Sequence, residues 1–378
     1  QDNTSTRWGK FRPYILFGSV PALIMIILCF TSPDLSQTGK FYWALFTYIT
    51  FTTLYTIIAI PVGSLIPAMT QDRDERTSLA SFRYLGASSG SIAVAVLTLP
   101  LVALFSSPQF GFPIVVGCLA VLGAIFAFLC FFNTKEVYSK PYEETIGIKK
   151  VTKMVFNNYP LHFVILALLT TWVANNIKQL TVVYFVKYNL QLEAYFSPIL
   201  LGVILQIMFG AYLVNLIKHR FEKKTLFMIG TFLYVITDLI IYYITGYENF
   251  WLLAFIATFG FIGFGMAGVM AWSMIADTIE YGEWKSGFRA EGVLNAAHVF
   301  VFKLSVGFSA WLAGVILEST DYVANAIDQS PETLNGLFIM GYIFPAVAGT
   351  IAIIVTYFNK YDSNFYERIF SELKQRQS

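Results

Sequence analysis

The chain has 378 residues, of which 56% are hydrophobic, 17% aromatic and only 13% charged, with a formal net charge of +2. Because an average soluble domain carries roughly 25% charged residues, this composition excludes an ordinary soluble domain and a disordered chain. The near-neutral charge gives no basis for nucleic-acid binding. An integral membrane protein surrounded by the lipid bilayer remains.

Apolar runs long enough to cross a hydrocarbon core of about 30 Å recur along the chain. We expect each to form a transmembrane helix, because backbone polar groups in lipid must be satisfied within their own segment. In chain order the ten runs cover residues 14–31, 42–66, 84–105, 113–132, 161–188, 195–217, 226–245, 250–276, 292–317 and 336–358. They predict an all-α polytopic membrane protein.

Lys and Arg are distributed unevenly over the segments between these runs. Most of the 25 basic residues lie at the two termini and in every second loop, and very few lie in the alternate loops. Cytoplasmic loops of membrane proteins carry such an excess. The pattern predicts a multi-pass protein of the cytoplasmic (plasma) membrane with both termini in the cytoplasm.

Two short patterns recur in the two halves of the chain. Residues 7–12 match 220–224, each a basic and aromatic turn that opens an apolar run, and residues 65–76 match 274–285. Internal repeats of this kind mark transporters built from duplicated halves. The second half has two runs before its copy of the first pattern, whereas the first half begins at that pattern. We therefore expect the first two of twelve helices to be missing; a natural ten-helix protein is the alternative.

This register predicts the domain organisation. Residues 1–132 form an N-terminal bundle of four helices, residues 133–158 form a cytoplasmic linker, and residues 159–378 form a six-helix bundle with a cytoplasmic tail. The linker is the longest polar stretch and carries five lysines.

Polar side chains within the apolar runs are candidates for a substrate path, because they are costly at membrane depth. Lys303 lies near the middle of its run and is expected to face an aqueous cavity, with a structural ion pair as the alternative. Amides offer donors and acceptors to hydroxyl-rich ligands, although hydrogen bonds between helices would also explain them. The other predicted substrate-binding residues within runs are Asn175, Asn176, Lys178, Gln179 and Trp272.

Asp238 is an acidic residue within a run. It lies in the outer third of its run beside Tyr242 and Tyr243. We expect it to have a structural role or to snorkel to the interface, and not to carry a proton.

Two charged turns, residues 72–76 and 277–289, mix acidic and basic side chains at the predicted cytoplasmic rim. Ion pairs between the two halves could close a reversible inner gate there, because exposed pairs contribute only ~0–1 kcal/mol each. Simple topology and solvation are the alternative.

Catalytic and metal-binding patterns are absent from the sequence. Its three Cys and three His are widely separated, and it has no Walker loop, nucleophile elbow or HExxH motif. A membrane-embedded enzyme, the competing class, would need a convergent acid, base or metal constellation. We expect neither an enzyme nor a bound metal.

Three segments carry a family resemblance: residues 2–14, 60–76 and 274–292, the last with the specific block ADTIEYGEWK. Through them the chain resembles the glycoside-pentoside-hexuronide cation symporters, which include the melibiose carrier and belong to the major facilitator superfamily. The resemblance implies two six-helix bundles around a central sugar site, and it independently implies that two helices are absent.

The resemblance also implies residue roles. Lys303 matches a lysine associated with the sugar and cation sites, and Arg83 matches, with a one-residue gap, a basic residue near the sugar. Ala59 stands where the melibiose carrier has an aspartate, so the resemblance disfavours Na⁺ coupling of the melibiose type, while H⁺ coupling, facilitated exchange and diffusion stay open. The predicted cytoplasmic gate and motif residues are Arg7, Gly9, Lys10, Arg12, Asp72, Arg76, Asp277, Tyr281, Gly282, Glu283 and Arg289.

The leading hypothesis is a monomeric secondary active transporter that couples a sugar or glycoside to a monovalent cation by alternating access. No cofactor is expected apart from a coupling Na⁺ or H⁺. The alternatives are a lipid or amphiphile carrier of the same fold and an inactive truncated symporter.

Overall fold

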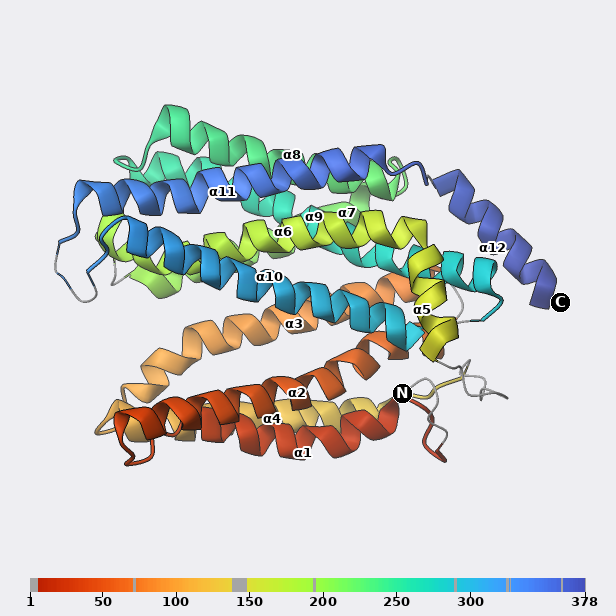
Figure 1. Cartoon of the computed structure of the whole chain (residues 1–378), viewed down its shortest axis with the longest axis horizontal. Coiled ribbons are helices and arrows are strands. Elements are labelled where there is room, and N and C mark those ends of the chain that lie inside the picture. Colours follow the sequence, from red (N-terminus) through yellow and green to blue (C-terminus); the bar gives the residue numbers. More distant parts are fainter. Residues whose placement is uncertain are drawn as a thin grey trace. The chain divides into compact units, whose positions relative to one another are not determined.

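A computed structural model of the protein describes residues 6–70, 73–137, 148–192, 195–288, 291–323, 326, 328–361 and 363–377. The regular secondary structure of these residues is helical, and no strand occurs among them (Figure 1). Among the described residues, ten helices are long and apolar enough to cross a membrane. The predicted all-α polytopic architecture is therefore confirmed.

Figure 1 shows the helices, coloured and labelled in chain order. Their bounds are α1 Arg12–Cys29, α2 Gln37–Met69, α3 Arg73–Val102, α4 Pro108–Asn133, α5 Ile148–Asn157, α6 Tyr159–Tyr184, η1 Phe185–Asn189, α7 Phe196–Ile217, α8 Lys223–Ile240, η3 Ile241–Thr245, α9 Phe250–Ser286, α10 Glu291–Ser319, α11 Pro331–Phe358 and α12 Ser363–Gln377. The short helices α5 and α12 lie in the predicted linker and tail, where the sequence predicted no helix.

Local signals fix several helix ends. Side chains of Ser36, Asn158, Asn249 and Ser330 accept hydrogen bonds from backbone N–H groups in the first turns of α2, α6, α9 and α11. These groups have no partner within the helix itself, so capping satisfies them. At the other end of α9, Gly287 adopts a left-handed conformation with φ 77° that ends the helix.

The chain divides into two compact units. Unit 1 comprises residues 1–151 and 291–299, and unit 2 comprises residues 152–290 and 300–378. In unit 1, α1 packs against α2 and α4; in unit 2, α8 and α7 pack against α9, and α6 and α8 pack against α11. The predicted domain boundaries stay a prediction.

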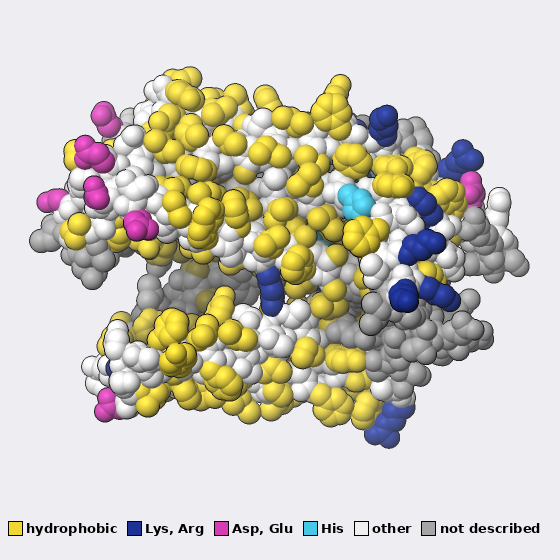
Figure 2. Space-filling model, in the orientation of Figure 1, with side chains coloured by type: hydrophobic (Ala, Val, Ile, Leu, Met, Phe, Trp, Pro, Cys, Tyr) yellow, Lys and Arg dark blue, Asp and Glu magenta, His cyan; other side chains and the backbone are white. Residues whose placement is uncertain are grey.

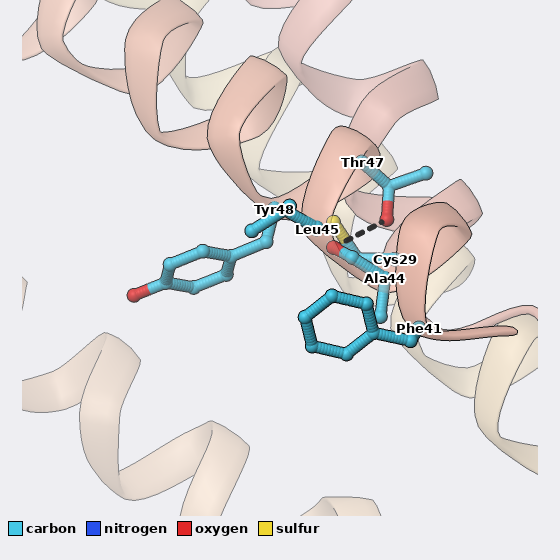
Figure 3. A pocket seen from close by; sticks show the side chains of 6 residues that line it. All are labelled: Cys29, Phe41, Ala44, Leu45, Thr47 and Tyr48. Atoms are coloured by element: carbon cyan, nitrogen blue, oxygen red, sulfur yellow. Dashed lines mark hydrogen bonds between the residues drawn. The ribbon is translucent and has the colours of Figure 1, made fainter. Parts of the chain in front are cut away.

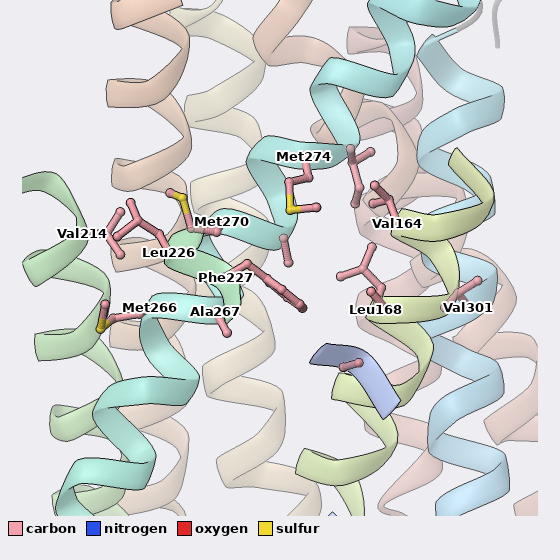
Figure 4. Close-up of a cluster of buried hydrophobic side chains, with 14 residues drawn as sticks. Val164, Leu168, Val214, Leu226, Phe227, Met266, Ala267, Met270, Met274 and Val301 are labelled. Carbon is pink, nitrogen blue, oxygen red and sulfur yellow. The ribbon is translucent and has the colours of Figure 1, made fainter. Parts of the chain in front are cut away.

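The core of unit 2 is a cluster of buried aliphatic, methionine and aromatic side chains (Figure 4). Val164 and Leu168 on α6, Phe227 on α8, and Met266 and Met270 on α9 converge there. The helices α7, α8 and α9 approach one another at backbone distance.

Glycines allow this approach, because a side chain on any of four of them would overlap the facing backbone: Gly210 on α7, Gly230 on α8, and Gly263 and Gly265 on α9.

Hydrophobic side chains cover the sides of the helices (Figure 2). On the face shown in Figure 2, Lys and Arg of unit 2 lie mainly at one end of the helices. Exposed large residues include Phe46, Phe126 and Trp251. An apolar surface of this extent fits contact with lipid rather than with water.

Candidate functional site

A polar contact joins α6 to α10 within unit 2. The Asn176 amide nitrogen donates to Ser305 Oγ at 3.0 Å, and the Ser305 hydroxyl donates to the carbonyl of Phe302 at 2.6 Å. Farther along, the Ser309 hydroxyl donates to the carbonyl of Val173 at 3.3 Å. Phe302, Ser305 and Ser309 recur at helical spacing, so one face of α10 carries this polar seam.

An indole lies beside the seam. The Trp172 ring meets Phe302 edge to face, with centroids 5.0 Å apart. Its Nε1 is buried and has no hydrogen-bond partner among the described residues. Lys303, half-buried, follows Phe302 on α10. The structure thus brings the predicted residues Asn176 and Lys303 to one pair of helices, together with Trp172 and Ser305, which were not in the predicted set.

Lys178 lies outside the contact between α6 and α10, in a different environment. Its ammonium pairs with Asp238 Oδ1, and both residues are buried, at 6% and 0% exposure. Asp238 therefore does not snorkel, and of the two expected roles the structural one stays open. Lys178 lies inside unit 2 and is engaged by α8.

The remaining substrate candidates lie on separate elements. Asn175 is buried, Gln179 is exposed, and Trp272 packs against the core cluster of Figure 4. Arg83 lies half-buried on α3 in unit 1. Their roles stay predictions.

The predicted motif in unit 1 forms an anion-capped helix start. Glu136 accepts hydrogen bonds from the backbone N–H groups of Lys10, Phe11 and Arg12, at 2.7, 2.9 and 3.0 Å. A carboxylate there satisfies otherwise unpaired donors and complements the helix dipole. Gly9 has φ 104°, and a Cβ on it would lie 2.5 Å from Glu136 Cδ. Glycine at this position lets the carboxylate approach the backbone.

Arg12 fastens the same turn to the end of α4. Its Nε donates to the carbonyl of Phe131 at 3.1 Å, and its Nη2 donates to the same oxygen. That carbonyl belongs to the last turn of α4, where cations are favourable. Arg7 stacks on Trp8, with Cζ 4.2 Å from the ring centroid, and Lys10 is buried.

The matching turn in unit 2 is held in a similar way. The Lys223 ammonium donates to both oxygens of Asp277, at 2.6 and 2.8 Å. Lys224 donates to the carbonyls of Tyr357 and Asn359 at the end of α11, at 3.0 and 2.6 Å. Asp277, predicted to pair between the halves, thus pairs within its own unit.

The end of α9 docks α12. Tyr281 packs with Tyr366, Ile369 and Leu373, and burial raises the pKa of the Tyr366 phenol. Trp284 Nε1 donates to a Glu372 carboxylate oxygen at 2.7 Å. Of the other predicted motif residues, Gly282 is buried and Glu283 half-buried. Asp72 and Arg289 lie outside the described residues, and only the backbone of Arg76 is described.

A shallow cavity of about 330 Å³ lies between the end of α1 and the start of α2 (Figure 3). Its lining is mostly apolar and carries two hydroxyls, those of Thr47 and Tyr48, of which the Thr47 hydroxyl donates to the carbonyl of Trp43 at 2.8 Å. A lining of this kind gives a sugar no array of donors and acceptors. No group of three metal-ligating side chains occurs among the described residues.

Comparison with known proteins defines the class. Residues 1–363 match the family described as MFS/sugar transport protein. A solved structure of FucP, a major facilitator superfamily transporter in the outward conformation, aligns with a TM-score of 0.63 at 11% identity, covering 93% of this chain and 84% of that one. This likeness confirms the predicted fold.

The chain belongs to the MFS/sugar transport protein family, and the resemblance to the glycoside-pentoside-hexuronide symporters is confirmed. It is 34% identical to the uncharacterized symporter YjmB of Bacillus subtilis, covering 97% of this chain and 80% of that protein. It is 32% identical to the isoprimeverose transporter of Lactiplantibacillus pentosus, covering 99% and 79%. It is also 32% identical to a putative sulfoquinovose importer of Escherichia coli, covering 98% and 79%. The protein is a multi-pass membrane transporter and not an enzyme.

Proposed function

We propose that this protein is a sugar or glycoside:cation symporter of the cytoplasmic membrane that works by alternating access, with both termini in the cytoplasm. The family match across residues 1–363 carries this proposal. The relatives named for isoprimeverose transport and sulfoquinovose import support a sugar-like substrate. The segregation of basic side chains to one end of unit 2 supports the orientation (Figure 2).

The seam between α6 and α10 is the proposed substrate contact of unit 2. Asn176 and Ser305 offer donors and acceptors for sugar hydroxyls, and the Lys303 ammonium offers donors. The buried Trp172 indole N–H has no described partner and lies beside an aromatic face that suits the apolar side of a sugar ring. Arg83, Asn175, Gln179 and Trp272 stay proposed contacts. Lys178 is left out of this set because Asp238 engages it.

The motif residues have a second proposed role. In each unit a cation holds the last carbonyls of a helix, and in unit 2 an ion pair joins α8 to α9. Such contacts keep the end of a bundle rigid while the bundle rocks about its substrate. We assign this role to Arg12 and Asp277, and the predicted gate role of Asp72, Arg76 and Arg289 stays a prediction. The apolar surface contacts lipid, and the protein acts as a monomer.

Exchange measurements test the proposal. The protein is reconstituted into liposomes loaded with one unlabelled sugar, and entry of the same labelled sugar is followed for a panel of glycosides, pentosides and hexuronides. We expect counterflow with at least one member, and at least a tenfold loss with Asn176→Ala. Glu248→Ala, on an exposed loop, is the matched control and should exchange as the wild type does. A folded protein that exchanges no member of the panel would contradict the proposal.

A further inference from the structure

A buried ion pair within unit 2 is not part of the proposed substrate contact. Lys178 on α6 pairs with Asp238 on α8, and both lie in membrane-spanning helices. Only one oxygen of the carboxylate is used. Asp238 Oδ2 is buried and has no hydrogen-bond partner among the described residues.

Such a pair is expensive for a purely structural contact. Removing two charges from water costs several kcal/mol for each ion, and well-packed apolar residues stabilise a bundle as well or better. A structural pair would gain most by satisfying both carboxylate oxygens. Ionisable groups that persist at membrane depth under these conditions mark ion and proton pathways.

Aromatic rings surround the ammonium. Lys178 Nζ lies 4.6 Å from the ring centroid of Tyr234, 5.2 Å from that of Phe261 and 5.1 Å from that of Tyr342. These rings come from α8, α9 and α11, and their faces attract a cation. The rings can stabilise the Lys178 ammonium in place of the carboxylate. Opening the ion pair therefore does not leave a buried positive charge without a partner.

In the part of the chain that the structure describes, three side chains adjoin the Lys178–Asp238 pair, and none of the three carries a full charge. Lys178 reaches Asp238 from α6 and is its charged partner. The rings of Tyr234 on α8 and Tyr342 on α11 adjoin the Lys178 ammonium that pairs with it. From α9 the adjoining side chain is Phe261, which does not titrate. The Lys178 ammonium is the only full charge among these four side chains.

Both helices that carry the pair change their hydrogen-bond register beyond it. The π-helical segment η3 begins at Ile241, three residues after Asp238, and η1 begins at Phe185, seven residues after Lys178. Ile241 and Phe185 are buried in one cluster with Phe338 and Tyr342. Each π segment forms the last turn of its membrane-spanning helix, ending at Asn189 and at Thr245.

We propose that Asp238 is the proton-binding group that couples transport to H⁺, with Lys178 as its counter-ion; this assignment rests on the proposed function. A proton from water on the side of higher proton potential bonds to Asp238 Oδ2, which becomes a neutral carboxylic acid. The ion pair opens, and the Lys178 ammonium stays within the three rings. Release of the proton to water on the other side restores the carboxylate and the pair.

Coupling requires the two states of the pair to favour different conformations, because a ligand shifts an equilibrium only through its differential affinity. The pair joins α6, which carries the proposed sugar contact Asn176, to α8. Opening the pair loosens this connection two residues from the sugar contact. Proton binding and sugar binding thereby act on the same helix.

Two variants separate coupling from a structural role. Asp238→Asn removes the proton site, and the double variant Lys178→Met, Asp238→Leu replaces the pair by apolar side chains that can pack. The matched control is Gln206→Leu, which removes another polar contact of unit 2, between α7 and α9, whose atoms lie 3.0 Å apart. Each protein is reconstituted and tested for counterflow, for sugar accumulation driven by a pH gradient, and for sugar-induced proton uptake.

We expect the wild type and Gln206→Leu to accumulate sugar against its gradient when the interior is alkaline. Asp238→Asn and the double variant should retain counterflow within a few fold, lose accumulation entirely, and show no sugar-induced proton uptake. Accumulation by the double variant equal to that of the wild type would overturn the proposal and leave a structural pair. Wild-type accumulation driven by a Na⁺ gradient but not by a pH gradient would overturn it while the proposed function stands.

Infrared spectroscopy supplies a readout that does not depend on the sugar. Difference spectra of the reconstituted wild type between alkaline and acidic buffer should contain the carbonyl stretch of a protonated carboxylic acid, and that band should be lost in Asp238→Asn and retained in Gln206→Leu. Identical bands in the wild type and Asp238→Asn would refute protonation of this residue. A wild type without counterflow would contradict the proposed function instead.

Discussion

The contact between α7 and α9 gives the sharpest test of packing in unit 2. Gly210 on α7 lies against the backbone carbonyl of Ile262, and Gly265 on α9 lies against that of Ile207. A methyl group on Gly210 would overlap a backbone atom, which cannot rotate away as a flexible side chain can. Overpacking costs about 1–3 kcal/mol, whereas Gly to Ala within a helix gains about 0.8–1 kcal/mol. A Cβ on Gly210 would lie 2.0 Å from the Ile262 oxygen, so the upper end of the overpacking cost applies, and we expect Gly210→Ala to destabilise the protein by roughly 2 kcal/mol net.

Gly202 on the same helix is the matched control, because a Cβ there meets no atom within 4 Å. Gly202→Ala should leave stability unchanged or slightly raised. Thermal unfolding of the purified proteins in one detergent, followed by tryptophan fluorescence, measures the difference. The melting temperature of Gly210→Ala should fall by a few degrees relative to Gly202→Ala. Equal melting temperatures would refute the reasoning that backbone proximity sets the cost.

Three further substitutions test contacts at the ends of the helices. Glu136→Ala removes the acceptor of three backbone N–H groups, so it should lower the melting temperature, whereas Glu248→Ala on an exposed loop should not. Asp277→Asn leaves its lysine partner facing a neutral amide, and we expect a similar loss of thermal stability; an unchanged melting temperature would contradict a stabilising ion pair. Trp284→Phe keeps the ring but loses the hydrogen bond to Glu372, so limited proteolysis should cleave α12 faster than in the wild type, and equal cleavage rates would show that the bond does not hold α12.

The membrane helices were predictable because their signal is local. Length and hydropathy alone place the run at 113–132 within α4 Pro108–Asn133 and the run at 336–358 within α11 Pro331–Phe358. The end of α9 was not predictable in this way. The run stops at residue 276, whereas the helix continues through charged residues to Ser286. Tertiary partners explain the extension, since Asp277 meets Lys223 and Tyr281 meets α12.

The candidate site was predictable only in its residue types. Polar side chains at membrane depth identify Asn176 and Lys178 equally, since they differ by half a helical turn and share one run. Their helix faces separate them: Asn176 meets α10, whereas Lys178 meets Asp238 on α8. No local signal connects Lys178 to a carboxylate 60 positions away. That pairing depends on how the helices of unit 2 pack.

The two basic turns, residues 7–12 and 220–224, hold helix ends in comparable ways. Arg12 holds one carbonyl with two nitrogens of its planar guanidinium, whereas Lys224 holds two carbonyls with one ammonium, yet each cation closes the end of a distant helix in its own unit. The two turns therefore close a helix end with different chemistry. Alignment of the halves by residue identity would score these positions as unrelated. Alignment by the helix end that each cation closes would recover them as equivalent.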